Sequence, residues 1–144
     1  MRIALASDHA GFELKEHVKA QLAAAGHDIV DVGPETDDSV DYPTFAAPAA
    51  RLVADGNADR GVLVCGSGVG VSIVANKVPG IRAVNAHDVE EAQLARQHND
   101  VNVVTLSGRR IDGQQADAIV AAFLSEDFEG GRHSRRVAAI EDLP

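Results

Sequence analysis

Short β-branched or apolar runs alternate along the chain with stretches that have helical spacing. The spacing is clearest at Leu14, Val18 and Leu22, which fall at i, i+4 and i+8, and Gly26 follows them as a C-terminal helix cap. Strand and helix alternate about every 25 residues, the pattern of right-handed βαβ units. We therefore predict an α/β fold: a doubly wound sheet of five parallel strands with helices on both faces. The five runs are residues 3–6, 29–32, 62–64, 83–86 and 101–106.

The size of the chain predicts one domain, residues 1–144, because 144 residues with 45% apolar content fill a single core. Aromatic residues make up 3% and Trp is absent, so the core has to be built from Val, Ile, Leu and Ala, as in buried parallel strands. A further amphipathic helix is expected at 114–124. Residues 132–144 are expected to form a C-terminal helix that belongs to the site or to a subunit interface.

The net charge and the cysteine content limit which binding partners and which cellular compartment can be expected. The net charge of -9 argues against general affinity for nucleic acid or an anionic membrane. Cys65 is the single cysteine, so no intrachain disulfide forms, and a cytoplasmic location is favoured. The N-terminus becomes polar too early for a signal peptide, and no stretch approaches the ~20 apolar residues of a membrane span.

In doubly wound sheets the ligand site lies at the carboxyl ends of the strands. The densest signal there is the segment 62–72, an apolar strand that runs into a loop with Gly66, Gly68 and Gly70 and then into helical sequence. Glycines let successive backbone N–H groups face one point, as in an anion-binding nest. The segment does not match the dinucleotide-binding pattern G-x-G-x-x-G, because Val71 stands at the position of the third glycine. It also lacks the Gly-Lys-Ser/Thr residues that end a P-loop. A tight strand-to-helix turn with no ligand fits the same residues.

Several side chains near this loop could transfer protons or bind anions. Cys65 is either an inert core residue or a thiolate favoured by the nearby helix N-terminus. His98, which follows a helical run at 90–97, is either a solvated helix end or an acid/base. Arg132 and Arg136 lie four residues apart at the start of a predicted helix, where cations are unfavourable unless they hold an anion such as phosphate. The histidines lack the spacing of known metal motifs, so no metal site is expected.

Seven segments together resemble the type B ribose-5-phosphate isomerases, a family whose relatives include galactose-6-phosphate isomerase subunits. The resemblance covers essentially the whole chain, in order and at matching spacing. It implies a Rossmann-like or flavodoxin-like sheet, a homodimer or dimer of dimers, and an active site where two subunits meet. It also implies that the reaction uses no cofactor or metal. The segments are 7–12 (SDHAGF), 41–43 (DYP), 65–70 (CGSGVG), 76–77 (NK), 80–83 (GIRA), 96–100 (RQHND) and 129–133 (EGGRH).

The resemblance implies an aldose-ketose isomerase that interconverts D-ribose 5-phosphate and D-ribulose 5-phosphate through an enediolate, in the non-oxidative pentose phosphate pathway. By position, Cys65 takes the proton from carbon 2, His98 opens the furanose ring, and Ser67 lies beside the reacting oxygens. A branch of the family with Ser at the position of Cys65 uses a nearby Glu instead, but residues 69–76 contain no carboxylate. This chain therefore resembles the cysteine branch.

The remaining roles implied by the resemblance concern substrate binding. The anion hole is formed by the backbone of Gly66, Gly68, Val69 and Gly70. The sugar is contacted by Asp8, Tyr42 and Asn99, and the phosphate is held by His9, Arg132 and Arg136. Arg109 reaches in from the partner chain, unless a one-residue shift exchanges it for Arg110. Two alternatives stay open, an isomerase of a six-carbon sugar phosphate such as allose or galactose 6-phosphate, and a non-catalytic phosphosugar-binding subunit.

Overall fold

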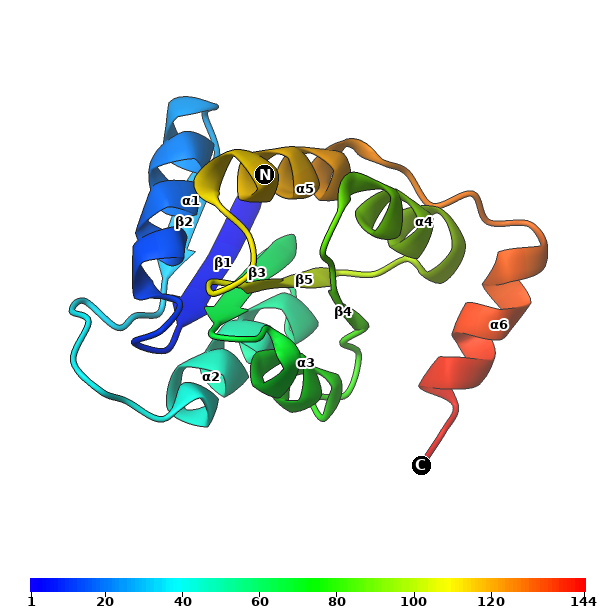
Figure 1. The fold of residues 1–144 in the computed structure, drawn as a ribbon. Coiled ribbons are helices and arrows are strands. Elements are labelled where there is room, and N and C mark those ends of the chain that lie inside the picture. The colour runs from blue at the N-terminus through cyan, green and yellow to red at the C-terminus, as the bar shows by residue number, and fades with distance from the viewer.

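The computed structural model describes residues 1–144 and contains one sheet of five parallel strands in the order β2-β1-β3-β5-β4 (Figure 1). The predicted doubly wound sheet is confirmed. Compared with the flavodoxin-like order, the last two strands have exchanged places, so the short β4 forms an edge. The strands are β1 (Arg2–Ser7), β2 (Asp28–Asp31), β3 (Arg60–Cys65), β4 (Ala83–Asn85) and β5 (Val103–Ser107).

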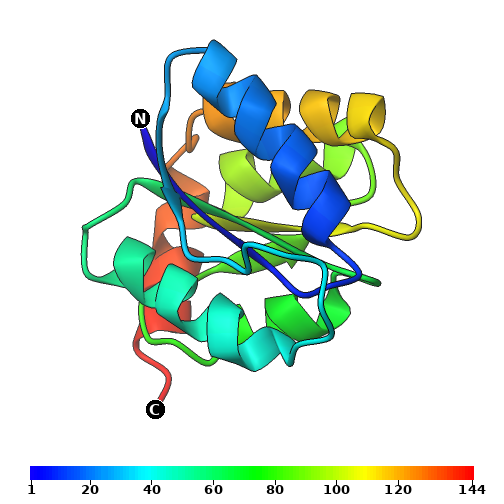
Figure 2. The ribbon, with the colours of Figure 1, turned by 90° about the vertical axis from the view of Figure 1, so that its left-hand side faces the viewer.

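Helices cover both faces of the sheet. Helices α1, α4 and α5 pack on one face, and α2 and α3 pack on the other (Figures 1 and 2). The last helix, α6, packs against α4 at the side of the molecule (Figure 1). No helix is long and apolar enough to cross a membrane. The helices are α1 (Phe12–Ala24), α2 (Tyr42–Ala54), α3 (Val69–Asn76), α4 (Val89–Asn99), α5 (Gly113–Ser125) and α6 (Arg132–Glu141).

The sequence predicted most helices but did not delimit α2. Its buried face consists largely of the small residues Ala46, Ala49 and Ala50, so large apolar side chains do not mark it at helical spacing. Pro48 lies inside the helix and works against the high helix propensity of these alanines. The predicted cap at Gly26 is confirmed, since this glycine has φ +88° just after the end of α1.

Two apolar clusters, one on each face of the sheet, form the core. One contains Leu14, Val18 and Phe123 from α1 and α5, and the other packs the alanines of α2 against β1 and β3. The central strands β1, β3 and β5 are buried almost throughout. Removing their side chains from water supplies the main force for folding. It also makes a rigid base for the loops that follow the strands.

A fully buried lysine links α1 to the end of β2. The Lys15 ammonium donates to Asp31 Oδ1 at 2.9 Å and to the Pro34 carbonyl at 2.8 Å, and Lys19 donates to Asp31 Oδ2 at 2.7 Å. Burial alone would raise the pKa of Asp31, but the hydrogen bonds from Lys19 and Lys15 outweigh it and hold the pKa below its usual 3.8. This network anchors the start of the loop 32–41, which borders the carboxyl edge of the sheet.

We predict that Asp31→Asn lowers the free energy of unfolding by about 2 kcal/mol at pH 7, because the buried Lys15 ammonium loses the less exposed of its two anionic partners. The other partner, Glu16, lies 3.0 Å from the ammonium and has 40% of its side chain exposed. A lowered carboxyl pKa stabilises the fold above the unfolded-state pKa and loses that effect as the pH falls through the folded-state pKa. The difference between parent and variant should therefore shrink from pH 7 to pH 3 in urea unfolding.

The matched control for this prediction is Asp28→Asn. Asp28 has 72% of its side chain exposed and pairs only with Arg2, so its loss should change stability by less than about 0.5 kcal/mol. Equal effects of the two substitutions would contradict the role of the Lys15 network.

Candidate active site

A cavity of about 420 Å³ lies at the carboxyl ends of β1 and β3, where the chain reverses its direction across the sheet. Such a switch point is where open α/β sheets bind their ligands. All its lining residues except Ala10 and Ile73 are site residues predicted from the sequence. The lining consists of Asp8, His9, Ala10, Tyr42, Cys65, Gly66, Ser67, Val69, Gly70, Ile73 and Arg109.

The loop between β3 and α3 presents backbone N–H groups to this cavity. Gly68 has φ +77° and caps α3, a conformation that favours glycine. Its N–H donates to the sulfur of Cys65 at 3.2 Å, and the N–H of Val69 donates to Ser67 Oγ at 3.2 Å. The N–H of Gly70, in the first turn of α3, has no partner in the chain. The loop can therefore bind an anion beside a thiol.

Three side chains hold the carbonyl groups of this loop toward the sheet. Ser107 Oγ donates to the Gly66 carbonyl at 2.7 Å, Asn85 Nδ2 to the Ser67 carbonyl at 3.1 Å, and Thr105 Oγ1 to the Gly68 carbonyl at 2.9 Å. In a trans peptide the N–H points opposite to the carbonyl. These hydrogen bonds from β4 and β5 therefore direct the N–H groups of Ser67, Gly68 and Val69 away from the sheet.

The sequence did not predict these roles of Ser107, Asn85 and Thr105, although a signal was present for two of them. Thr105 and Ser107 interrupt the apolar run of β5 and are fully buried there. A buried hydroxyl is costly unless it forms a hydrogen bond, so two hydroxyls on one face of a central strand indicate a partner beyond the strand.

The other walls of the cavity come from the loops after β1 and from the start of α2. Asp8 is 8% exposed and accepts the N–H of Gly11 at 2.9 Å. His9 Nδ1 lies 3.2 Å from the N–H of Val40, and when it accepts that hydrogen the other ring nitrogen carries a proton that it can donate to an anion. The Tyr42 ring lies so close to Gly70 that a Cβ there would come within 2.6 Å of it.

Arg109 lines the cavity of its own chain, whereas the resemblance implied that it reaches in from a partner. Its guanidinium covers Gly66, and its backbone N–H donates to the Gly66 carbonyl at 3.1 Å. The turn after β5 thus packs directly on the loop after β3, so both contribute to one cavity. Arg110 is exposed and does not line the cavity.

His98, Asn99, Arg132 and Arg136 lie outside this cavity. His98 and Asn99 occupy the last turn of α4, rather than following the helix as predicted. Because α4 returns from the carboxyl end of β4 to the amino end of β5, its 11 residues carry His98 about 16 Å back across the sheet. Arg132 begins α6 and Arg136 lies one turn further along it. In both views α6 lies on the far side of the molecule from the carboxyl ends of β1 and β3 (Figures 1 and 2). One chain therefore does not bring His98 to Cys65.

Comparisons with known proteins found relatives that match nearly the whole chain. The sequence profile of a family described as Ribose/Galactose Isomerase matches residues 3–140. Ribose-5-phosphate isomerase B of Escherichia coli strain K12 is 46% identical over 139 residues, which cover 96% of this chain and 93% of that protein.

Two solved structures superpose on nearly the whole chain. The ribose 5-phosphate isomerase of Thermotoga maritima has a TM-score of 0.96 at 46% identity and covers 99% of this chain and 98% of its own. The ribose-5-phosphate isomerase B of Mycoplasma genitalium, solved with bound ribulose-5-phosphate, has a TM-score of 0.93 at 42% identity and covers 97% and 93%.

We predict that Gly68→Ala slows alkylation of Cys65 by iodoacetamide at least several-fold at neutral pH. A methyl group at this position would overlap Asn85 Oδ1 and strain the backbone at φ +77°, so the N–H would no longer reach the sulfur. Because Cys65 is the single cysteine, intact mass reports its alkylation directly.

Gly80→Ala is the matched control, since Gly80 has φ +85° but nothing within 4 Å of an added Cβ. Both variants should lose about 1–2 kcal/mol of stability through backbone strain, and only Gly68→Ala should change the alkylation rate. Unchanged alkylation in Gly68→Ala would rule out the proposed contact.

Proposed function

Since this chain belongs to the ribose/galactose isomerase family, we propose that it interconverts D-ribose 5-phosphate and D-ribulose 5-phosphate. The observation that carries the proposal is the position of the Cys65 sulfur, which lies at the base of the cavity and accepts a backbone N–H from the glycine loop. A thiolate there can act as a base, and the loop beside it can stabilise negative charge. Both groups are needed to move a proton next to a carbonyl.

The reaction begins with removal of a proton that is only weakly acidic, the hydrogen on carbon 2 of the open-chain aldose. The Cys65 thiolate takes this proton while hydrogen-bond donors stabilise the developing enediolate oxygen. The N–H of Gly70 and the hydroxyl of Ser67 line the cavity and can donate to that oxygen. The hydroxyl on carbon 2 gives its proton to the oxygen on carbon 1, and return of the proton from the thiol to carbon 1 then gives the ketose. The chain is neither oxidised nor reduced in this cycle.

Phosphate binding holds the reacting carbons in place. His9 and Arg109 are at the cavity wall and supply a proton donor and a guanidinium for the phosphate. The phosphate is remote from the bonds that change, so its binding energy can fix the position of carbons 1 and 2 against Cys65. Asp8 and Tyr42 complete the wall as partners for sugar hydroxyls.

A second copy of the chain completes the site in this proposal. His98 is the acid/base proposed to open the furanose ring, but it lies at the opposite edge of the sheet from Cys65. A homodimer in which α4 and α6 of one subunit cover the cavity of the other would supply His98, Asn99, Arg132 and Arg136. Val69 and Ile73, which are 51% and 59% exposed beside the cavity, would be covered by such a partner. A dimer of dimers would keep this pairing.

We propose a five-carbon rather than a six-carbon substrate because of what the relatives are named for. Those compared above are named ribose-5-phosphate isomerase, and one of them is solved with ribulose-5-phosphate. We place the reaction in the non-oxidative pentose phosphate pathway and in the cytoplasm, where a thiol base stays reduced.

Replacing Cys65 by Ser tests the proposal most simply. Cys65→Ser keeps the shape of the side chain but replaces the thiol by a much weaker acid, so turnover of ribose 5-phosphate should fall by about 10²- to 10⁴-fold. The dissociation constant for the sugar phosphate, measured by calorimetry, should change little. Intact mass of the parent with substrate should show no covalent sugar adduct, because a base leaves none.

Near-parental turnover in Cys65→Ser would exclude the thiol as the base. The same result would direct the search to Asp8, the carboxylate of the cavity. Loss of binding together with turnover would instead point to a structural role for Cys65.

A further inference from the structure

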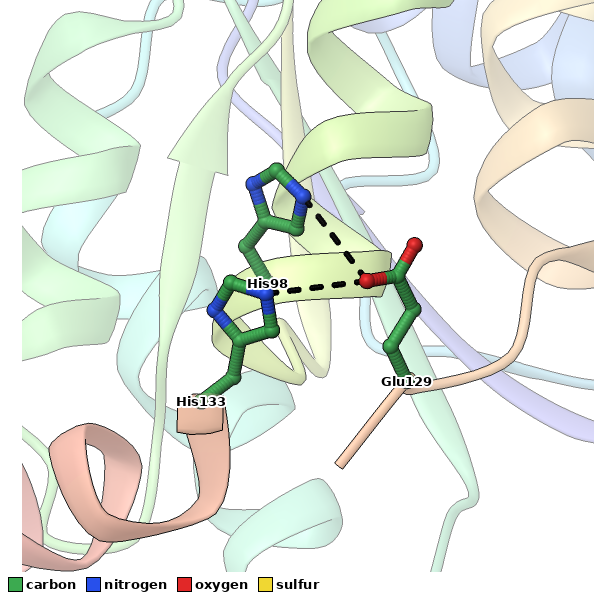
Figure 3. A group of neighbouring side chains, drawn as sticks. All are labelled: His98, Glu129 and His133. Carbon is green, nitrogen blue, oxygen red and sulfur yellow. Dashed lines mark ion pairs between the residues drawn. The ribbon is translucent and has the colours of Figure 1, made fainter. Parts of the chain in front are cut away.

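Two histidines and a glutamate converge at the junction of α4 and α6. His98 Nε2 and His133 Nε2 lie 4.0 Å and 3.6 Å from the same oxygen of Glu129, and the ligand atoms all lie within 4.8 Å of one another (Figure 3). The two imidazole rings stack with centroids 4.3 Å apart and an interplanar angle of 14°. Their ring nitrogens therefore face the carboxylate from the same side.

None of these three side chains forms a hydrogen bond within the chain, although one of them is deeply buried. The His133 side chain is only 8% exposed, and its Nε2 points to Glu129 at a distance too long for a hydrogen bond. The three possible ligand atoms thus face one another without a hydrogen bond between them, and the space they surround can hold an ion.

The backbone holds the three residues in this arrangement. The N–H of Glu129 donates to the Gln97 carbonyl at 3.0 Å, and Gln97 Nε2 donates to the Glu126 carboxylate at 2.9 Å, which ties the segment before α6 to α4. Gly130 and Gly131 both have positive φ, at 66° and 55°, and this tight turn brings Glu129 back over His133. The ligand atoms thus lie on two elements that are fixed to each other.

We propose that His98, Glu129 and His133 bind a divalent transition-metal ion of the Zn²⁺ class. Two imidazoles and one carboxylate are a ligand set that zinc accepts, with a fourth position left for water. Bonds of ~2.0–2.1 Å at tetrahedral angles place ligand atoms about 3.3 Å apart, so small side-chain rotations close the observed gaps. His98 is 38% exposed, which leaves an entry path for the ion.

The charges around the site act on a cation in opposite directions. A metal binds the neutral form of each imidazole. Arg132 and Arg136 oppose the incoming cation, whereas Glu129 supplies one negative charge, 3.6 Å from His133 Nε2 and 4.0 Å from His98 Nε2.

Binding at this site has a consequence for activity that rests on the proposed function. A metal bound to His98 Nε2 occupies a nitrogen that would otherwise carry a proton, so ring opening should be inhibited. The site thereby links divalent transition metals to control of the isomerase. Binding itself can be measured without any reference to the reaction.

The experiment titrates the full-length protein with ZnCl₂ by calorimetry and with Co²⁺ by visible absorption. The parent should bind one ion per chain, and His133→Gln and Glu129→Gln should each weaken binding by at least about 10-fold. His87→Gln is the matched control, because His87 forms an exposed pair with Glu91 at 3.4 Å, and it should bind like the parent. Cys65→Ser should also bind like the parent.

The proposed metal site would be wrong if both His133→Gln and Glu129→Gln bound the metal with the affinity of the parent. It would also be wrong if Cys65→Ser lost binding, or if the parent bound no metal at a 100-fold excess. Turnover of each variant is then measured with and without Zn²⁺, and inhibition is the ratio of the two rates. Zn²⁺ should inhibit the parent and the His87→Gln control. If the binding pattern holds but turnover is not inhibited, the metal site stands and the acid/base role of His98 fails.

Discussion

The hydrogen bonds that hold the loop after β3 against the sheet are the interaction on which the site depends. Ser107, Asn85 and Thr105 bind the carbonyl groups of Gly66, Ser67 and Gly68 in turn. The N–H groups between them face the cavity as a result, and one of them meets the Cys65 sulfur. Such preorganised donors stabilise negative charge without reorganising during the reaction. Side chains from the buried strands β3 and β5 therefore hold this glycine-rich loop in the geometry that lets it bind negative charge.

Sheet topology imposes a second constraint, because it separates the two groups that would act on one sugar. Cys65 ends β3 at the carboxyl edge, and His98 ends the helix that leads to the amino end of β5. A local motion of the chain cannot bring a residue from the amino ends of these buried strands to their carboxyl ends. In our proposal the site is therefore complete only when a second chain brings its α4 and α6 to the cavity. The same helix pair places His98 beside Glu129 and His133, the residues that we propose hold a metal with it.

The sequence predicted the sheet and the cavity well because apolar runs ended directly at glycines and polar residues. Asp8, Cys65 and Gly70 could be placed at the carboxyl ends of the strands because the strands were predicted to be parallel, and the structure brings these residues together. The resemblance implied that Arg109 reaches into the partner's cavity, whereas Arg109 lines the cavity of its own chain. Spacing along a chain does not tell which subunit a side chain serves. Lys15 and Thr105 escaped prediction because a buried lysine or hydroxyl is explained only by distant partners, Asp31 and the Gly68 carbonyl.

The central claim is that Cys65 of one chain acts together with His98 of another, and a mixed dimer tests it directly. Chains carrying Cys65→Ser and chains carrying His98→Asn are co-expressed with different tags, and the mixed dimer is purified through both. Each variant alone should be nearly inactive, whereas the mixed dimer contains one site with both native residues and should turn over ribose 5-phosphate at about half the parental rate. Activity no higher than that of the two separate variants would contradict a site shared between subunits.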